Sequence, residues 1–195
     1  MLKIASPGVP DFYQGNDLCD FSLVDPDNRR PVDFDRRQAN LRAISGSAER
    51  DRAALLHELL RKWRDGRIKM FITRETLRAR RILLHLFETG RYIPLETIGR
   101  HANHLLAFAR QSGRAQALVV VPRCLARVNP LPSAVLGRVS WDDTAVVLPN
   151  RAADRWRDFL SANVVVARNR AGQRALEVRD ILKACPAAVL ERIRG

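Results

Sequence analysis

The chain has 195 residues, and 46% of them are hydrophobic, which suffices for one medium domain or two small ones and argues against wholesale disorder. Its 34 lysines and arginines exceed its 21 acids by 13, a surplus that raises the question of a nucleic-acid partner. Because no run of five basic residues occurs, we expect a solvated basic surface and no nucleic-acid site.

The cysteines and the apolar runs indicate which cellular compartment to expect. Cys19, Cys124 and Cys185 are odd in number and far apart, so they predict free thiols and neither a disulfide framework nor a zinc site. No apolar run is long enough for a signal peptide or a membrane span. We therefore expect a soluble, cytoplasmic chain with no metal, cofactor or membrane contact.

The first 35 residues are rich in Pro, Gly and Asp, with seven Asp among them. The string SPGVPDFYQG predicts turn residues followed by a short strand over Val9–Tyr13. From there to Phe34 neither a helical nor a strand period is visible. This stretch predicts a long structured loop, a kind of segment that is usually functional inside a compact domain.

Residues 36–89 have helical character. One helix is predicted over Ala53–Trp63, ending at Gly66. A second is predicted over Arg74–Glu88, with Thr73 as its N-cap and Gly90 after it. Their apolar stripes consist of Leu55, Leu56, Leu59, Leu60 and Trp63 in the first helix, and of Leu77, Leu83, Leu84 and Phe87 in the second.

From Arg91 onward, short apolar runs are separated by Gly, Asn or Pro, which predicts an antiparallel β-sandwich or small barrel with Trp141 in its core. A short helix near Asp180–Ala184 is expected before a last strand around Ala187–Leu190. The domain boundary therefore falls at Gly90. The other expected strands cover residues 91–98, 104–111, 115–122, 144–149, 163–168 and 174–178.

Several strings in this chain resemble the maltooligosyltrehalose synthases, (1→4)-α-D-glucan 1-α-D-glucosylmutases of the α-amylase clan. The string LVDPDNRRPVDF at Leu23–Phe34 is the most specific, and PGVPDFYQG at 7–15 resembles the last barrel strand of the clan. Further matches are WRDGRIK at Trp63–Lys69, LRARR at Leu77–Arg81, Tyr92 with Pro94 and Leu95, Trp141 with Asp143 and Thr144, Trp156–Asp158, Cys185 with Pro186, and Val189 with Leu190.

The resemblance implies an α+β chain in two parts. Residues 1–90 would be the C-terminal remnant of a (β/α)8 barrel, comprising the eighth strand and helices, and residues 91–195 an antiparallel β-sandwich domain. The intact enzyme would isomerise the reducing-end α-1,4 linkage of a maltooligosaccharide to α,α-1,1, a step of trehalose biosynthesis. This retaining intramolecular transglucosylation needs two carboxyl groups about 5–5.5 Å apart.

The catalytic carboxylates of the clan lie at the ends of the fourth, fifth and seventh barrel strands, which would precede Met1. The resemblance thus implies no catalytic residue here and no activity of the chain alone. Its expected partners are a maltooligosaccharide and the missing N-terminal barrel portion.

Five residues are the candidates for substrate binding: Tyr13, Gln14, Asn28, Arg29 and Arg30. Tyr13 would lie near the end of the eighth strand on the active-site face. The alternative for Tyr13 is a core aromatic with a satisfied hydroxyl.

Three acids flank the two arginines of this loop, namely Asp25, Asp27 and Asp33. We expect them to form an Asp–Arg network that fixes the loop, because pairing with arginine lowers the pKa of a carboxyl and prevents it from acting as an acid at neutral pH. Asp17 and Cys19 stand where the family is expected to have Glu and Trp, which removes a stacking face for sugar.

Other aromatic and imidazole side chains are given structural roles. Phe12, Phe21 and Phe34 are predicted to be core residues. His101 and His104 form an HxxH string without a third ligand nearby, so a turn is expected and no metal site.

Two further expectations concern partners. A stand-alone module that binds carbohydrate, or a polyanion through the basic residues 36–195, is the alternative function. If the barrel is missing, the apolar helix stripes of residues 1–90 need cover, and a homodimer through these residues would provide it.

Overall fold

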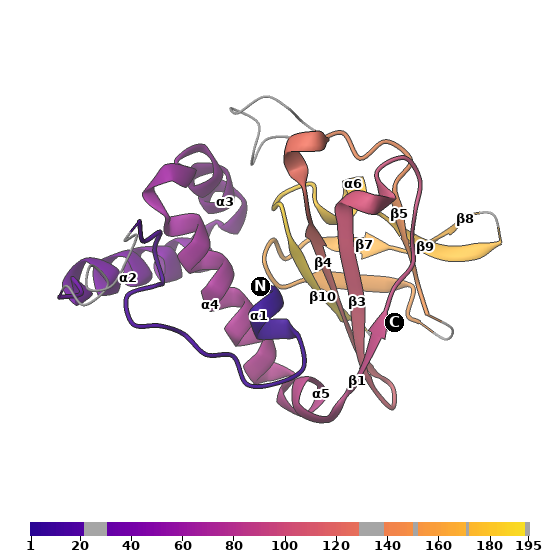
Figure 1. The fold of residues 1–195 in the computed structure, drawn as a ribbon, viewed down its shortest axis with the longest axis horizontal. Helices are drawn as coiled ribbons and strands as arrows, with labels where there is room; N and C mark the ends of the chain where they lie inside the picture. The colour runs from indigo at the N-terminus through magenta and orange to yellow at the C-terminus, as the bar shows by residue number, and fades with distance from the viewer. Residues whose placement is uncertain (22–30, 129–138, 150–151, 171, 194–195) are drawn as a thin grey trace.

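The computed structural model describes residues 1–21, 31–128, 139–149, 152–170 and 172–193 (Figure 1). Helices occupy the chain up to Thr89 and strands dominate from Arg91, so the chain is α+β as predicted. No described helix combines the length and apolar character needed to cross a membrane. The predicted residues Asp25, Asp27, Asn28, Arg29 and Arg30 lie outside the described residues.

The main helices begin at residues whose side chains or backbone suit a helix start. Asp33 accepts a hydrogen bond from the Arg36 N–H at 2.9 Å, and Asp51 caps the next helix in the same way. The helices are α1 (Leu2–Ala5), α2 (Phe34–Arg50), α3 (Arg52–Arg61), α4 (Arg67–Ile82) and α5 (Leu84–Thr89), with a 3₁₀ turn, η2 (Trp63–Asp65), before α4.

The predicted helix over Arg74–Glu88 is wrong in its bounds. Helix α4 already starts at Arg67, because Gly66 adopts the left-handed conformation at φ +79° and Asp65 accepts from the Arg67 N–H at 2.9 Å. Thr73 is therefore inside a helix and is not an N-cap. The helix stops at Leu83, and α5 follows as a separate element.

The expected strand over Val9–Tyr13 is also wrong, so the eighth barrel strand is absent from the described structure. Residues 9–13 are irregular, and the Val9 side chain is 94% exposed. No described strand pairs with the backbone of this segment, and an unpaired strand is not stable. Phe12, Phe21 and Phe34 are exposed, contrary to the prediction that they are core residues.

The strands form two antiparallel sheets. Each predicted run contains a strand, whereas β6 (Arg155–Asp158) and β8 (Arg168–Arg170) were not predicted, and the short helix α6 (Val178–Ile181) starts earlier than expected. The six-stranded sheet has the order β1 (Arg91–Pro94), β3 (Leu105–Ser112), β4 (Ala115–Pro122), β10 (Ala188–Arg192), β6 (Arg155–Asp158) and β7 (Val164–Val166). The four-stranded sheet has the order β2 (Thr97–Ile98), β5 (Ala145–Val147), β9 (Gln173–Glu177) and β8 (Arg168–Arg170).

Both faces of the six-stranded sheet are apolar because alternate residues of its central strands point to opposite sides. On one side Leu118 packs with Leu176 of the second sheet, in a cluster that also contains the buried Trp141, as predicted. On the other side Phe108 and Val119 pack against residues of helices α1, α4 and α5. Figure 1 shows these helices beside the six-stranded sheet. The sheet is thus sandwiched between helices and a smaller sheet.

The helix stripes are largely covered within this chain. Leu55, Leu56 and Leu59 of α3 are buried in a cluster with residues of α2 and α4. Leu160 and Cys185, from the part of the chain after Gly90, belong to the same cluster. Hydrophobic contacts therefore cross the expected boundary at Gly90 in two separate clusters.

Candidate functional site

The candidate site is a tight turn, Tyr13–Asp17, in the irregular N-terminal segment. The Asn16 N–H donates to the Tyr13 carbonyl at 3.1 Å. Gly15 has a φ of +81°, and a Cβ at this position would lie 2.9 Å from Cγ2 of Val32. Only glycine fits this turn without displacement of its neighbour. The turn presents Tyr13 and Gln14 to solvent.

Two basic side chains from different helices hold the turn. Arg37 of α2 donates through Nε and Nη2 to the Gly15 carbonyl at 3.2 and 2.7 Å, and its Nε lies 3.5 Å from the Asp17 carboxylate. Lys69 of α4 donates from Nζ to Asn16 Oδ1 at 2.6 Å and to the Leu18 carbonyl at 2.9 Å. Sequence reasoning assigned neither residue to the site, although Lys69 ends the string WRDGRIK that it singled out.

The rest of that string builds the corner from which Lys69 projects. Arg67 donates from Nε to Asp65 at 2.8 Å and from Nη2 to Glu58 of α3 at 2.8 Å. These hydrogen bonds fix the start of α4 relative to α3. Hydrogen bonds from Arg67 and Lys62 also hold the pKa of the Glu58 carboxyl below its usual value.

A cavity of about 500 Å³ opens beside the turn, between the N-terminal segment, α4 and the ends of β4 and β10. Its volume lies in the range of about 300–1,000 Å³ that is typical of small-ligand sites. Phe12 and Asn16 line it, and the Lys3 ammonium lies 4.8 Å from the Phe12 ring centroid. The remaining wall is mostly apolar, formed by Met1, Ile4, Ile68, Ile72, Val121, Pro122, Leu125, Pro186 and Ala187, with Lys69 and Thr73 as further polar residues.

The structure brings only part of the predicted site together. Tyr13 is 55% exposed, so the alternative of a buried core tyrosine is wrong. Gln14 is exposed beside it. The carboxylate of Asp33 caps α2, and its expected pairing with Arg29 and Arg30 stays a prediction, because both arginines lie outside the described residues.

Among the carboxyl groups of the described residues, that of Asp158 is clearly perturbed by burial. Desolvation raises its pKa, as a general acid requires, while hydrogen bonds from Ser161, Leu160 and Val189 oppose the rise. Ser161 donates its hydroxyl at 2.6 Å and its N–H at 2.8 Å to one carboxylate oxygen. The other oxygen accepts the N–H groups of Leu160 and Val189, both at 3.2 Å. Donors of the protein itself occupy both oxygens of this buried carboxyl group, so it cannot reach a substrate.

The two histidines of the HxxH string lie close together without forming a metal centre. Their ring centroids are 6.2 Å apart, and His101 Nε2 lies 3.4 Å from Asp142. Within the described ranges, no group of three or more His, Cys, Asp or Glu side chains is placed to hold a metal ion. His101 also packs edge-on against Trp141, as expected of a structural residue.

Comparisons with known proteins point to one family of enzymes. No family model matches the chain. Proteins named maltooligosyl trehalose synthase in two strains of Mycobacterium tuberculosis are 35% identical over 161 residues, which make up 83% of this chain and 16% of the relative. The chain therefore matches only a small share of the length of these relatives.

Solved structures of the same enzyme share the fold. A mutant of maltooligosyltrehalose synthase from Arthrobacter ramosus matches 98% of this chain with a TM-score of 0.68 and 29% identity, over 21% of its own length. A second maltooligosyl trehalose synthase structure matches with a TM-score of 0.59 at 24% identity, and that likeness concerns the fold alone.

Proposed function

The chain is homologous to a portion of the maltooligosyl trehalose synthases, fitting a C-terminal portion, and from this premise we propose that it forms one wall of the substrate cleft of such an enzyme. The reaction would convert the reducing-end α-1,4 linkage of a maltooligosaccharide to α,α-1,1 by retaining intramolecular transglucosylation. Tyr13 and Gln14 would contact the oligosaccharide.

The observation that carries this proposal is the rigidly held, solvent-facing turn Tyr13–Asp17. An exposed aromatic ring offers a flat face to a sugar, and a neighbouring amide offers both a donor and an acceptor. Such contacts contribute to catalysis only if they are placed before the substrate arrives. The hydrogen bonds from Arg37 to the Gly15 carbonyl and from Lys69 to Asn16 support the proposal, because they fix the turn that carries Tyr13 and Gln14.

We propose further that the catalytic carboxyl groups come from another portion of the enzyme and that the 195 residues alone are inactive. Retaining chemistry needs an ionised nucleophile and a protonated acid that both reach the glycosidic oxygen or carbon. Asp158 is buried under four hydrogen bonds, and Glu75 is fully buried among arginines. Neither group can take part in such a pair.

The exposed apolar side chains of the N-terminal segment are the surface that the catalytic portion would cover. Val9, Phe12 and Phe21 are exposed on the same segment as the turn. Exposed aromatic residues in one segment are typical of a protein contact. Covering them would place the catalytic portion next to Tyr13.

A chimera tests the proposal. The matching segment of the Arthrobacter ramosus enzyme is replaced by this chain, and conversion of maltopentaose to its trehalose-ended isomer is followed. We expect activity in the chimera and none in the isolated chain. Tyr13→Ala should lower kcat/KM by roughly tenfold to a hundredfold, as for loss of an aromatic substrate contact. Leu41→Ala, an exposed change on α2, is the control and should leave kcat/KM unchanged.

The outcomes separate the two parts of the proposal. Trehalose-ended product from the isolated chain, in a preparation free of host amylases, would contradict its inactivity. An active chimera whose kcat/KM is unchanged by Tyr13→Ala would contradict the proposal that the turn lines the substrate cleft.

A further inference from the structure

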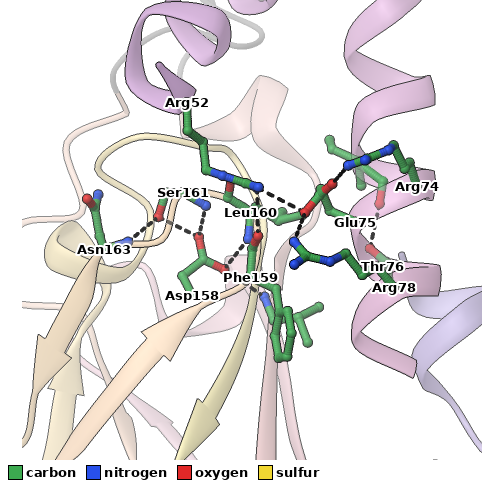
Figure 2. Close-up of polar contacts among 12 residues, drawn as sticks. Arg52, Arg74, Glu75, Thr76, Arg78, Asp158, Phe159, Leu160, Ser161 and Asn163 are labelled. Carbon is green, nitrogen blue, oxygen red and sulfur yellow. Dashed lines mark hydrogen bonds and ion pairs between the residues drawn. The ribbon is translucent and has the colours of Figure 1, made fainter. Parts of the chain in front are cut away.

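Three arginines converge on one fully buried carboxylate at the junction of helices and sheet (Figure 2). Arg52 of α3 donates to Oε2 of Glu75 at 2.9 Å, and Arg78 of α4 donates to the same oxygen at 3.4 Å. Arg74 donates to Oε1. The cluster therefore holds three positive charges against one negative charge. Hereafter it is called the Glu75 cluster.

The three arginines differ in what else they bind. Arg52 also donates to the carbonyls of Phe159 at 3.1 Å and Leu160 at 3.2 Å, in the loop after β6, so it joins two helices to the sheet. Arg74 and Arg78 each use Nη1 for Glu75, and the other N–H groups of their guanidinium side chains have no acceptor among the described residues. Their side chains are 26% and 54% exposed, so these donors can reach solvent.

The spacing of Arg74 and Arg78 is unfavourable unless an anion lies nearby. Residues four apart share one face of a helix, and like charges at this spacing destabilise it. Glu75 neutralises only one of the three positive charges. A guanidinium presents a planar fork of donors that matches two oxygens of a phosphate or carboxylate group. Two such forks, one turn apart, can grip a tetrahedral oxyanion between them.

We propose that the solvent side of the Glu75 cluster, between Arg74 and Arg78, binds a small tetrahedral dianion of the phosphate type, either free or as a monoester. The maltooligosaccharide of the proposed function carries no charge, so this site lies outside that function. Because Arg52 ties the cluster to the loop after β6, a bound dianion would stabilise the junction between the helical layer and the sheet.

Binding of inorganic phosphate to the whole chain tests the site. Calorimetry and thermal unfolding are measured in phosphate and in chloride at equal ionic strength. We expect phosphate to bind and to raise Tm relative to chloride. Arg78→Gln should weaken binding roughly tenfold, as for loss of a charge-assisted hydrogen bond. Arg61→Gln is the matched control, because Arg61 is exposed in the last turn of α3, away from the arginines of the Glu75 cluster.

Glu75→Gln distinguishes an anion site from a purely structural ion-pair cluster. Removing the competing carboxylate frees donors, so this variant should bind phosphate more tightly than the parent. If it does not fold, Arg74→Gln replaces it and should weaken binding as Arg78→Gln does. Glycerol phosphate is the second probe and represents a phosphate monoester. Binding of either probe supports the site. Absence of binding by both, or an equal loss in Arg61→Gln, would overturn the proposal.

Discussion

At the residue scale, buried polar side chains with several partners distinguish this chain from a generic packed domain. Asp158 organises the loop that follows β6 through four hydrogen bonds, and Val189 of β10 is one of the donors. Arg110 of β3 lies fully buried against helix ends, and burial together with the charge of Arg80 lowers its pKa. Such groups are costly to bury unless their partners are complete, so small changes at them should be felt strongly.

Cysteine reactivity is the first residue-scale prediction. Cys19 and Cys124 are exposed, whereas Cys185 is buried and desolvation raises its pKa to about 12. A thiol reagent at pH 8 should therefore modify two cysteines in the native chain and the third only after unfolding, since the thiolate is the reactive form. Mass spectrometry of tryptic peptides identifies the sites. Rapid native labelling of Cys185 would contradict the burial.

A second residue-scale prediction concerns Asp158 and pH. Burial raises the pKa of Asp158, so the native chain keeps this proton at pH values where the unfolded chain has lost it. The free energy of unfolding of the parent should then fall, relative to Asp158→Asn, as pH rises from the usual pKa of an Asp through the raised one, and level off above it. Urea unfolding measured at rising pH from about 4, the ordinary pKa of an Asp, follows this fall.

The same substitution should also destabilise the chain overall. An Asn side chain turns one acceptor oxygen into an NH₂ group that faces backbone donors, which costs about 1–3 kcal/mol. Glu49→Gln, on the exposed face of α2, is the control. If the free energy of unfolding of the parent, minus that of Asp158→Asn, rises with pH, hydrogen bonding outweighs desolvation in setting the pKa of Asp158.

At the element scale, arginine side chains donate hydrogen bonds to carbonyl groups at helix ends. Arg110 donates through Nη2 to the carbonyls of Phe87 and Gly90, both at 2.8 Å, and through Nη1 to Ala5 at 3.4 Å. Arg80 donates to Ile4 at 2.6 Å and Gly8 at 2.7 Å. Helix C-terminal carbonyls lack partners within the helix and carry partial negative charge, so a cation stabilises them. In this way the sheet and α4 hold α1 and α5 in place.

Replacement of Arg110 tests how much these hydrogen bonds stabilise the chain. Arg110→Met keeps most of the volume but leaves three carbonyl groups without their donor, and should lower the free energy of unfolding by about 2–4 kcal/mol. Arg110→Lys keeps the charge without the fork and should be intermediate. Arg114→Met, at an exposed position on the same hairpin, serves as the comparison in urea unfolding. Equal stability of Arg110→Met and the parent would exclude a structural role for these hydrogen bonds.

At the scale of the whole molecule, the helices and the two sheets share their hydrophobic clusters. Phe87 and Ala79 of the helices pack with Phe108 and Val189 of the six-stranded sheet. The stripes that were expected to need a partner are therefore mostly covered in the chain itself. Homodimer formation through residues 1–90 stays a proposal, and the exposed Leu77, Ile82 and Leu84 provide a surface for it.

Sedimentation tests this association. If the parent forms the proposed dimer, its average mass should rise across a tenfold range of concentration, because an exposed apolar patch gains free energy when covered. Ile82→Glu places a charge in the patch and should keep the chain monomeric. Val166→Glu, an exposed valine on β7, is the control and should associate like the parent. A compact monomer of the parent throughout would rule out the dimer.

The sequence by itself determined the features that depend on neighbours along the chain. The leucines of α3 have the helical period, and the runs that became β3 and β4 have the apolar character of buried strands. Gly66 and Gly90 mark ends of helical elements as expected, and the matched strings identify the related enzymes. All of these follow from local periodicity, turn residues and short motifs.

Only the tertiary structure decided what depends on residues far apart in the chain. Val9–Tyr13 has strand-like residues but pairs with no described strand, and a strand requires a partner. The hydrogen bonds of Arg37 and Lys69 to the Tyr13–Asp17 turn join residues that are more than twenty and more than fifty positions apart in the sequence, respectively. The Glu75 cluster joins α3, α4 and the loop after β6. Ion pairs and strand pairs carry no periodic signal, because their partners are set by how packed layers meet.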